Sequence, residues 1–397
     1  MSLPVLAVFS HLRWGFVYQR PQHLMSRLAG RWRVLFIEEP VPCRGPAHLA
    51  VHEPLPNLSV LTPQTPQAVQ GFHDDQIAMV ESLLTEHLKL HPAVPRVAWL
   101  YTPMALPLVH AVRPACLVYD CMDELAAFKD APRQMRQRET ALLRRAALVF
   151  AGGPSLYEAK RHLHPHVVCM PSSVDVAHFA PAGLRAGSEP HRRSQALQGH
   201  LAGPRLGWFG VIDERMDLHL LATLADAHPQ WQLVMVGPVV KIDPQSLPRR
   251  ANIHWLGQQP YDCLPYLLAG WDLCLMPFAL NEATRCISPT KTLEYMAGSK
   301  PVVSTPIADV VSMYEHAVEV ARGAGAFVRA CEAVLAEDAV ARGERALRML
   351  TTVFMHSWDR SADSMHELVS RALAQALARA TTLGDPPPRQ AAAGSRS

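Results

Sequence analysis

The chain has 397 residues, 49% of them hydrophobic, and a formal net charge of +3. This length exceeds what one hydrophobic core usually holds and therefore predicts two domains, while the small charge argues against nucleic acid as a partner. The eight cysteines show no Cys-x-x-Cys spacing, which argues against a zinc site and predicts reduced packing residues.

The first half of the chain alternates short apolar runs with helical patterns, which is typical of βαβ units around a parallel sheet. The opening apolar run is interpreted as a buried strand, because it has neither a basic start nor a small-residue cleavage site, and no segment is long enough to span a membrane. We expect strands at 5–9, 34–38, 97–101, 117–119, 148–151 and 167–170, and helices at 21–30, 75–89 and 133–146.

The stretch from 180 to 204 is rich in Gly, Pro, Ser and Arg and predicts a linker between domains. The alternation of short apolar runs and helical patterns then begins again, so two Rossmann-like α/β domains with parallel sheets should face each other across a cleft. The final residues contain three consecutive prolines and are expected to be disordered. The predicted boundaries are 1–178 for the first domain, 179–204 for the linker, 205–352 for the second domain and 383–397 for the tail.

Residues 287–306 form the most informative segment, with the pattern of a loop, a helix, a glycine stop and a buried strand. Ser288 is suited to cap the helix, Pro289 suits the first helical position, and Thr290 continues the helix entrance. The unpaired amides of a first helical turn attract an anion such as a diphosphate. The alternative is an ordinary helix of a parallel α/β domain.

Two charged side chains follow at this helix entrance. Lys291 supplies a mobile positive charge for an anion. Glu294 lies one turn further along the helix and could accept hydrogen bonds from a diol such as a ribose. Together these features suggest a nucleotide ligand.

This segment resembles the nucleotide-sugar signature of GT-B glycosyltransferases, particularly the retaining family-4 type, in its Glu-Tyr-Met-Ala and Gly-x-Pro-Val-Val sequences. That family usually has a first glutamate eight residues before the second, a position occupied here by Cys286. Glu282 and Arg285 stand nearby as possible replacements.

Further landmarks extend the resemblance over nearly the whole chain. They are the Pro-Ser-Ser-Val-Asp turn at 171–175, the glycine-ended strand at 206–210, Gly-Pro at 237–238, Leu-Gly at 256–257 and the run from Trp271 to Pro277. The resemblance implies a GT-B fold in which a C-terminal helix, placed at 353–382, crosses back to the first domain.

On the second-domain side, Gly210 and Gly237 end strands, where a backbone without side chains can approach a ligand closely. Asp213 and Arg215 follow Gly210 directly. We expect Arg215 and Lys291 to neutralise a diphosphate together. The alternatives are tight turns for the glycines and solvated surface charges for the cations.

On the first-domain side, His11, Arg13 and Trp14 follow the first strand, where a related enzyme would place a glycine-rich loop facing the acceptor and the donor phosphate. Asp120 lies near the end of another strand, where it could contact an acceptor hydroxyl as a general base or cap the following loop. Gly153 lies in a further turn expected to face the cleft.

The sequence lacks the motifs of other enzyme classes that use a Rossmann-like fold. No Gly-x-Gly-x-x-Gly follows the first strand, and the late Gly-Ala-Gly at 323–325 is interpreted as a helix entrance, which argues against a dehydrogenase. Gly-x-Ser-x-Gly is also absent, which argues against a serine hydrolase.

We therefore predict a cytoplasmic glycosyltransferase that moves a sugar from a nucleoside diphosphate sugar to a cell-surface polysaccharide or lipid-linked glycan. The segments 10–15 and 19–23 resemble a subgroup that includes teichuronic-acid-type enzymes. Retention of anomeric configuration is what the resemblance implies, and no metal or other cofactor is expected because the cations would stabilise the leaving group. The alternatives are a degenerate GT-B protein that binds nucleotide or glycan, and a nucleotide-sugar epimerase.

Arginines on two first-domain helices raise a further hypothesis of peripheral contact with an anionic membrane at its inner face. The alternative is two solvated helix faces. The residues are Arg20, Arg27, Arg31 and Arg33 around one helix and Arg133, Arg136, Arg138, Arg144 and Arg145 around the other.

Overall fold

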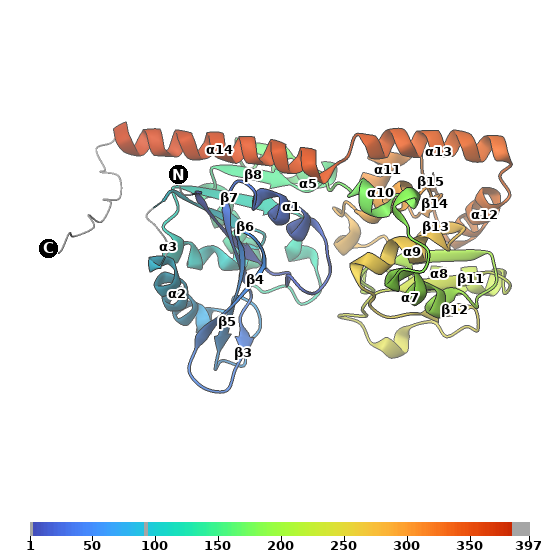
Figure 1. The fold of residues 1–397 in the computed structure, drawn as a ribbon, viewed down its shortest axis with the longest axis horizontal. Helices are drawn as coiled ribbons and strands as arrows, with labels where there is room; N and C mark the ends of the chain where they lie inside the picture. The colour runs from blue at the N-terminus through green and yellow to red at the C-terminus, as the bar shows by residue number, and fades with distance from the viewer. Residues whose placement is uncertain (1–2, 91–93, 383–397) are drawn as a thin grey trace.

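The computed structural model describes residues 3–90 and 94–382. Two α/β domains lie side by side, and one long C-terminal helix runs along the first domain (Figure 1). The predicted fold class, two Rossmann-like domains with parallel sheets, is confirmed. The disorder predicted for 383–397 lies outside the described residues.

The first domain is built on a sheet ordered β3-β5-β2-β1-β6-β7-β8-β9, with β4 pairing antiparallel to β5 and all other pairs parallel. Strand β1 lies near the middle, between β2 and β6, and all six of its residues are buried because helices cover both sheet faces. The strands are β1 (Val5–Ser10), β2 (Arg33–Glu38), β3 (Val41–Pro42), β4 (His48–Leu55), β5 (Leu58–Thr65), β6 (Arg96–Leu100), β7 (Cys116–Cys121), β8 (Leu148–Ala151) and β9 (Val167–Cys169).

The helices of this domain follow the expected alternation with strands. They are α1 (Arg20–Leu28), α2 (Asp74–Lys89), α3 (Val109–Val112), α4 (Met135–Arg145) and α5 (Pro154–Lys160), with short 3₁₀ turns at Pro103–Leu108 and Leu125–Ala127. The β4–β5 hairpin was not predicted, because its strand β4 is largely exposed and lacks the continuous apolar run of the central strands.

The second domain has an all-parallel sheet ordered β12-β11-β10-β13-β14-β15. Its strands are β10 (Arg205–Phe209), β11 (Gln232–Val236), β12 (Ile253–Trp255), β13 (Leu273–Met276), β14 (Val302–Ser304) and β15 (Glu319–Val320). Its helices are α8 (Leu218–Ala227), α9 (Leu264–Ala269), α10 (Lys291–Ala297), α11 (Ala308–Tyr314), α12 (Ala324–Leu335) and α13 (Ala339–Phe354), with 3₁₀ turns at Pro244–Ser246, Tyr261–Cys263 and Glu282–Thr284.

The segment expected to be only a linker contains regular structure, namely a 3₁₀ turn at Pro181–Gly183 and α7 (Glu189–Gln198), and α6 (Val176–Phe179) leads into it. Helix α7 packs on the second domain, because the buried Gln198 donates to the Leu267 carbonyl and accepts from the Trp271 indole. Leu197 also packs against the second-domain core, and Arg193 donates to Gln259, so a largely polar helix is held by scattered contacts that its sequence does not reveal.

Helix α14 (Trp358–Thr382) returns to the first domain and packs along α1. Arg27 pairs with Asp359 and Arg31 with Asp363, both at 2.7 Å. The C-terminal helix expected at 353–382 therefore begins at Trp358, after α13 has ended at Phe354 (Figure 1). In the part of the chain described, no helix combines the length and apolarity needed to cross a bilayer.

Candidate functional site

Three adjoining hollows lie where loops of both domains meet beyond the strand ends. We name them the aromatic cavity, of about 630 Å³, the cationic pocket, of about 120 Å³, and the mixed-charge cavity, of about 600 Å³. The first two share Gly210 and Lys291, and the last two share Asp123 and Arg215. The cations therefore stand at the junctions of one continuous cleft.

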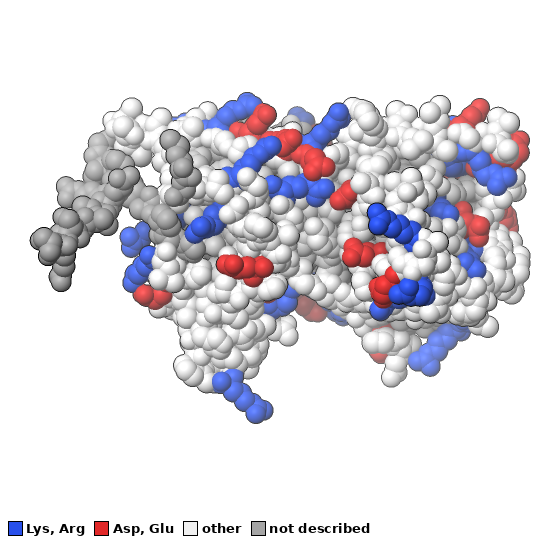
Figure 2. All heavy atoms as spheres, viewed as in Figure 1, with Lys and Arg blue, Asp and Glu red and all other residues white. Residues whose placement is uncertain are grey.

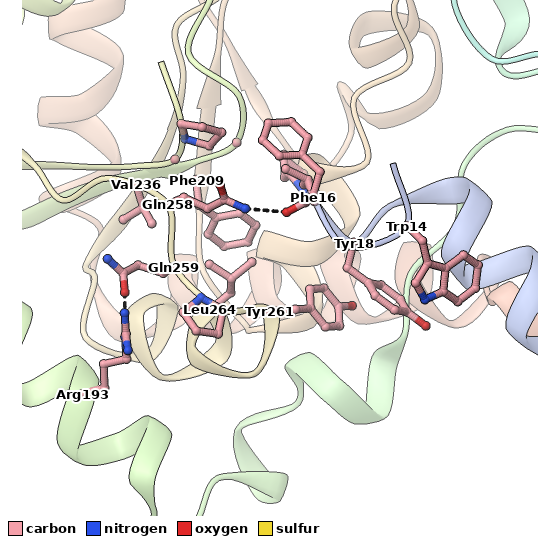
Figure 3. A pocket seen from close by; sticks show the side chains of 17 residues that line it. Trp14, Phe16, Tyr18, Arg193, Phe209, Val236, Gln258, Gln259, Tyr261 and Leu264 are labelled. Carbon is pink, nitrogen blue, oxygen red and sulfur yellow. Dashed lines mark hydrogen bonds between the residues drawn. The ribbon is translucent and has the colours of Figure 1, made fainter. Parts of the chain in front are cut away.

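The aromatic cavity is closed by rings from both domains (Figure 3). Tyr18 of the first domain stacks on Tyr261 of the second, with ring centroids 4.7 Å apart. The side chain of Gln258 donates to the Phe16 backbone carbonyl across the same boundary. The loop between β1 and α1 thus covers the strand ends of the second sheet, which suits a flat ring lying between apolar walls.

The two strand-end glycines lie where the sequence predicted, and both line the aromatic cavity. Gly237 has φ +147°, and a Cβ atom there would meet the Gly210 carbonyl oxygen at 1.7 Å. Gly210 has φ +156° and also lines the cationic pocket. The close packing of these turns brings bare backbone to the cleft wall.

Arg215 and Lys291 both line the cationic pocket, as the sequence suggested. Asp213 is buried behind Arg215 and accepts two-pronged hydrogen bonds from its guanidinium, including one of 2.7 Å. Lys291 donates to Glu294 at 2.9 Å, and its ammonium lies 5.1 Å from the centroid of the Phe209 ring. Each cation is thus held in place by a buried carboxylate behind it.

The predicted helix entrance differs in detail. Helix α10 begins at Lys291 with Thr290 in the cap position, so neither Ser288 nor Pro289 occupies its predicted place in the helix. Ser288 and Pro289 belong to the loop before the helix, and both line the cationic pocket together with Thr290. Because α10 has only seven residues, its dipole is short, and the electrostatics of the pocket rest mainly on side-chain charges.

Glu294 is buried beneath the aromatic cavity, with 4% of its side chain exposed. Its neighbours are Lys291 and Tyr261, and its charge helps to raise the pKa of Tyr261, for which burial is the largest cause. Glu294 itself lines none of the three cavities, and Lys291 stands between its carboxylate and the cleft. The assignment of Glu294 to a ribose diol stays a prediction.

Asp120 is placed differently from the expectation. It is fully buried, and its carboxylate is clasped by the Nε and Nη2 atoms of Arg20 at 2.9 to 3.2 Å. Arg20 also donates to the Met170 carbonyl and reaches the wall of the cationic pocket. Burial raises the pKa of Asp120, and the Arg20 guanidinium opposes that rise. In this arrangement Asp120 orients Arg20 from behind, away from a reacting hydroxyl.

The other first-domain candidates separate into different places. His11 lines the mixed-charge cavity, where burial lowers its pKa to about 4 and its Nδ1 atom has no partner among the described residues. Trp14 lines the aromatic cavity and packs edge-on against Phe36. Arg13 pairs with Glu38 at 3.2 Å and lines none of the three cavities, and its acceptor-side role stays a prediction.

Gly153 lies at the domain boundary. A Cβ atom at this position would meet the Asp309 carboxylate at 2.1 Å and the Ser288 side chain at 2.6 Å. Asp309 accepts a hydrogen bond from the Ser155 backbone N–H at the start of α5. A side chain at this position would therefore collide with residues of the other domain, and the acceptor-side role of Gly153 stays a prediction.

The position of the missing first glutamate is closed to the cleft. Cys286 is buried and packs with the hydrophobic core of the first domain. Glu282 and Arg285 pair with each other at 3.4 Å, with 78% and 65% of their side chains exposed. Both candidate replacements therefore face solvent.

Asp123, Glu39 and Phe128 are cleft residues that the sequence analysis did not select. Burial raises the pKa of Asp123 to about 6 and that of Glu39 to about 7. The Phe128 ring faces the Arg215 guanidinium at 5.4 Å and the Lys241 ammonium at 4.7 Å, both from the other domain. The only sequence signal was that Asp123 follows a buried strand; the partners are distant in the chain.

The first-domain arginines do not form one free basic surface. Arg20 is buried, Arg27 and Arg31 pair with carboxylates of α14, and Arg138 pairs with Asp74. Exposed arginines without an ion pair among the described residues remain around α4: Arg133, Arg136, Arg144 and Arg145. The hypothesis based on α1 is therefore corrected, because its charges are used within the fold.

All eight cysteines are free, as predicted. Within the described residues, no group of three or more His, Cys, Asp and Glu side chains is arranged to hold a metal ion. The expectation that no metal is needed stays a prediction.

Facing Rossmann-like domains, a returning C-terminal helix and a cleft between them define the GT-B architecture. Residues 203–337, which contain most of the second domain, match the family model described as "Glycosyl transferases group 1". The resemblance identified from the sequence is thereby confirmed.

One curated relative is a Bacillus subtilis (strain 168) protein provisionally named teichuronic acid biosynthesis glycosyltransferase TuaH. It is 29% identical over 148 residues, which are 36% of this chain and 37% of the relative. The chain therefore matches little more than a third of that relative's length.

Solved structures share the fold over almost the whole chain. Sucrose-phosphate synthase from Thermosynechococcus elongatus has a TM-score of 0.73 at 16% identity, covering 94% of this chain and 100% of that one. Anabaena HepE in complex with UDP and glucose has a TM-score of 0.64 at 15% identity, covering 93% and 100%. At this identity the likeness establishes the fold.

Proposed function

We propose that the protein is a glycosyltransferase that takes a sugar from a nucleoside diphosphate sugar and passes it to a cell-surface polysaccharide or lipid-linked glycan. The observation that carries the proposal is the order of the three hollows: an apolar ring site, a pocket with cations, and a second large cavity. That order matches the parts of the reaction, namely base, diphosphate and acceptor.

In this proposal the base lies in the aromatic cavity beside Tyr261, and the ribose lies above Lys291 and Glu294. The diphosphate occupies the cationic pocket, where Arg215 offers a planar fork and Lys291 a point charge. These cations stabilise the leaving diphosphate as the glycosidic bond breaks, without a metal ion. Backbone at Gly210 allows the phosphates to approach closely.

The acceptor enters the mixed-charge cavity, where the sugar-bearing end of the donor would emerge beside Arg215. Asp123 lines both this cavity and the cationic pocket, so it is better placed than Asp120 to contact an acceptor hydroxyl. Its raised pKa is suited to accepting a proton near neutral pH. The anomeric carbon keeps its configuration in this proposal, as in the retaining enzymes that the signature resembles.

We place the protein in the cytoplasm, where nucleotide sugars are the donors, with the free arginines around α4 contacting anionic lipid at the inner face of the membrane. The support is that Arg133, Arg136, Arg144 and Arg145 are exposed and lack ion pairs among the described residues. Charges of this kind attract an anionic surface.

A second candidate is a GT-B protein that binds nucleotide or glycan without turnover. It is favoured by the position of the missing first glutamate, where Cys286 is buried while Glu282 and Arg285 face solvent. Such a protein would keep the cationic pocket and lose only the contact to the reacting sugar.

A thermal-shift screen against nucleoside diphosphates and their sugars, followed by product analysis with the best binder, separates these functions. Release of nucleoside diphosphate together with a new glycosidic product supports transfer. Binding without turnover on any acceptor or water favours the binding protein, and interconversion of two nucleotide sugars would indicate an epimerase.

A further inference from the structure

Helix α13 carries an apolar face that points away from the protein. Five large hydrophobic side chains at its outer side and C-terminal end are 54% to 72% exposed: Val340, Leu347, Leu350, Phe354 and Met355. We call these residues the α13 face. In Figure 2 the upper edge of the molecule over the C-terminal half of this helix is largely white, in contrast to the charged surface over the start of α14.

The helix is apolar on two opposite sides. Positions 340, 347 and 354 are seven residues apart, so they fall on one side of a helix, and 350 lies between them on the same side. Met349 and Val353 point the other way and are buried in the second-domain core. Only the inner side is needed for folding, so the exposed side indicates an interaction surface.

We propose that the α13 face docks on the surface of a lipid bilayer, with its apolar side chains entering the boundary between headgroups and acyl chains. This inference does not depend on the reaction proposed above. An amphipathic helix lying in that boundary gains free energy from each apolar side chain without requiring a matching partner surface.

The size of the face distinguishes a bilayer from a second copy of the chain. A helix of 16 residues is about 24 Å long, and one row of its side chains buries a few hundred Å² at most. Stable protein interfaces bury roughly 1,200 Å² or more in total. A bilayer has no such threshold, because it moulds itself around the helix.

The charges beside the face also suit lipid. The Arg360 guanidinium lies 5.6 Å from the Phe354 ring centroid, and Arg348 is exposed on α13 itself. Within the described residues neither has a carboxylate partner, while Glu344 adds one negative charge to the same helix. Long arginine side chains can keep their stems on the apolar face while their ends reach headgroup phosphates.

The test is co-sedimentation of the full chain with vesicles of phosphatidylcholine alone and of phosphatidylcholine mixed equally with phosphatidylglycerol. The wild type should bind both, and the mixed vesicles more tightly. Leu347→Asp and Phe354→Asp should each weaken binding to both by about tenfold or more, because each removes the transfer of one large apolar side chain. Arg348→Gln with Arg360→Gln should reduce the preference for phosphatidylglycerol and leave binding to phosphatidylcholine alone unchanged.

Two controls make the result specific. Leu163→Asp changes an exposed leucine in the first domain and should leave binding unchanged, and Arg133→Glu with Arg136→Glu should lower binding to the mixed vesicles while leaving binding to phosphatidylcholine alone unchanged. Thermal unfolding should show that the α13 variants fold normally, since their side chains face outward. The proposal is overturned if the wild type binds neither vesicle, if the α13 variants bind as the wild type does, or if sedimentation velocity shows a dimer that Leu347→Asp dissociates while vesicle binding persists.

Discussion

The two sides of the cleft are built in different ways. On the second-domain side, Gly210, Asp213 and Arg215 come from one loop, and Lys291 and Glu294 come from one turn of α10. On the first-domain side, the ion pair between Arg20 and Asp120 joins residues 100 positions apart. The functional residues of the second-domain side are close together in the sequence and can be recognised there. Those of the first-domain side come together only when the chain folds.

Removing Asp120 should give the largest effect and test whether the first-domain side is structural. Asp120→Ala leaves Arg20 buried without its partner, so the free energy of unfolding should fall by about 3 to 5 kcal/mol. Urea denaturation monitored by fluorescence measures this loss.

The matched control for that experiment replaces both partners. Asp120→Leu combined with Arg20→Met should recover much of the stability, because no charge is then left buried. If Asp120→Ala instead folds with normal stability and only turnover is lost, Asp120 belongs to the chemistry and the contrast between the two sides fails.

A variant of Lys291 tests whether the second-domain side of the cleft binds the diphosphate. Lys291→Ala should weaken binding of a nucleoside diphosphate by about 1.5 to 3 kcal/mol while leaving the bare nucleoside almost unaffected, because a charge-assisted bond is lost. Titration calorimetry measures both ligands. Lys89→Ala on the exposed side of α2 serves as the control, and equal losses for nucleoside and diphosphate would contradict the assignment.

Variants of Glu294 test the second-domain side further, at the proposed ribose contact. Glu294→Ala should weaken donor binding by about 1 to 3 kcal/mol, and Glu294→Gln less, because the amide retains one acceptor. A 2′-deoxy donor should then penalise the wild type more than the alanine variant. An alanine variant that binds donor normally but cannot turn over would place Glu294 in the reaction itself.

Asp123 should give the smallest effect, and one that depends on pH. Its pKa of about 6 lies above the ordinary value of 3.8, so the folded protein holds this proton more tightly than the unfolded chain. The resulting cost to folding is complete above pH 6 and disappears as the pH falls towards 4. Asp123→Asn should therefore stabilise the protein by about 1 to 2 kcal/mol at pH 8 and hardly at pH 4.

Thermal unfolding across this pH range measures the effect. Asp130→Asn, at an exposed position in the same loop, should leave stability unchanged at both pH values. A constant difference between wild type and Asp123→Asn at every pH would show that the effect does not come from ionisation.

The fold was predictable wherever strands are buried on both faces. Strand β8 begins and ends at the expected residues, and the ends of β1, β2 and β6 lie within one residue of those expected, because continuous apolar runs define these strands. The hairpin strand β4 and helix α7 were missed, since their residues are mostly exposed and their stability comes from partners elsewhere in the chain.

Site residues were predictable where their role depends on nearby sequence, such as a glycine at a strand end or a charged side chain next to one. The glycines at 210 and 237 line the cleft because strand ends converge there. Arg215 lies in the loop after β10 and Lys291 at the start of α10, and both line the cationic pocket. Asp120 could not be assigned, because only the fold brings Arg20 to its carboxylate. Phe128 had no signal either, since its contacts are cations of the other domain.

The central proposal is that a nucleoside diphosphate spans the junction between the aromatic cavity and the cationic pocket. A crystal structure with the tightest-binding nucleoside diphosphate tests it most directly. We predict that the base contacts Tyr261 and that diphosphate oxygens lie about 3 Å from the Lys291 ammonium and the Arg215 guanidinium. A diphosphate bound away from both cations, or a base bound in the mixed-charge cavity, would contradict the proposal.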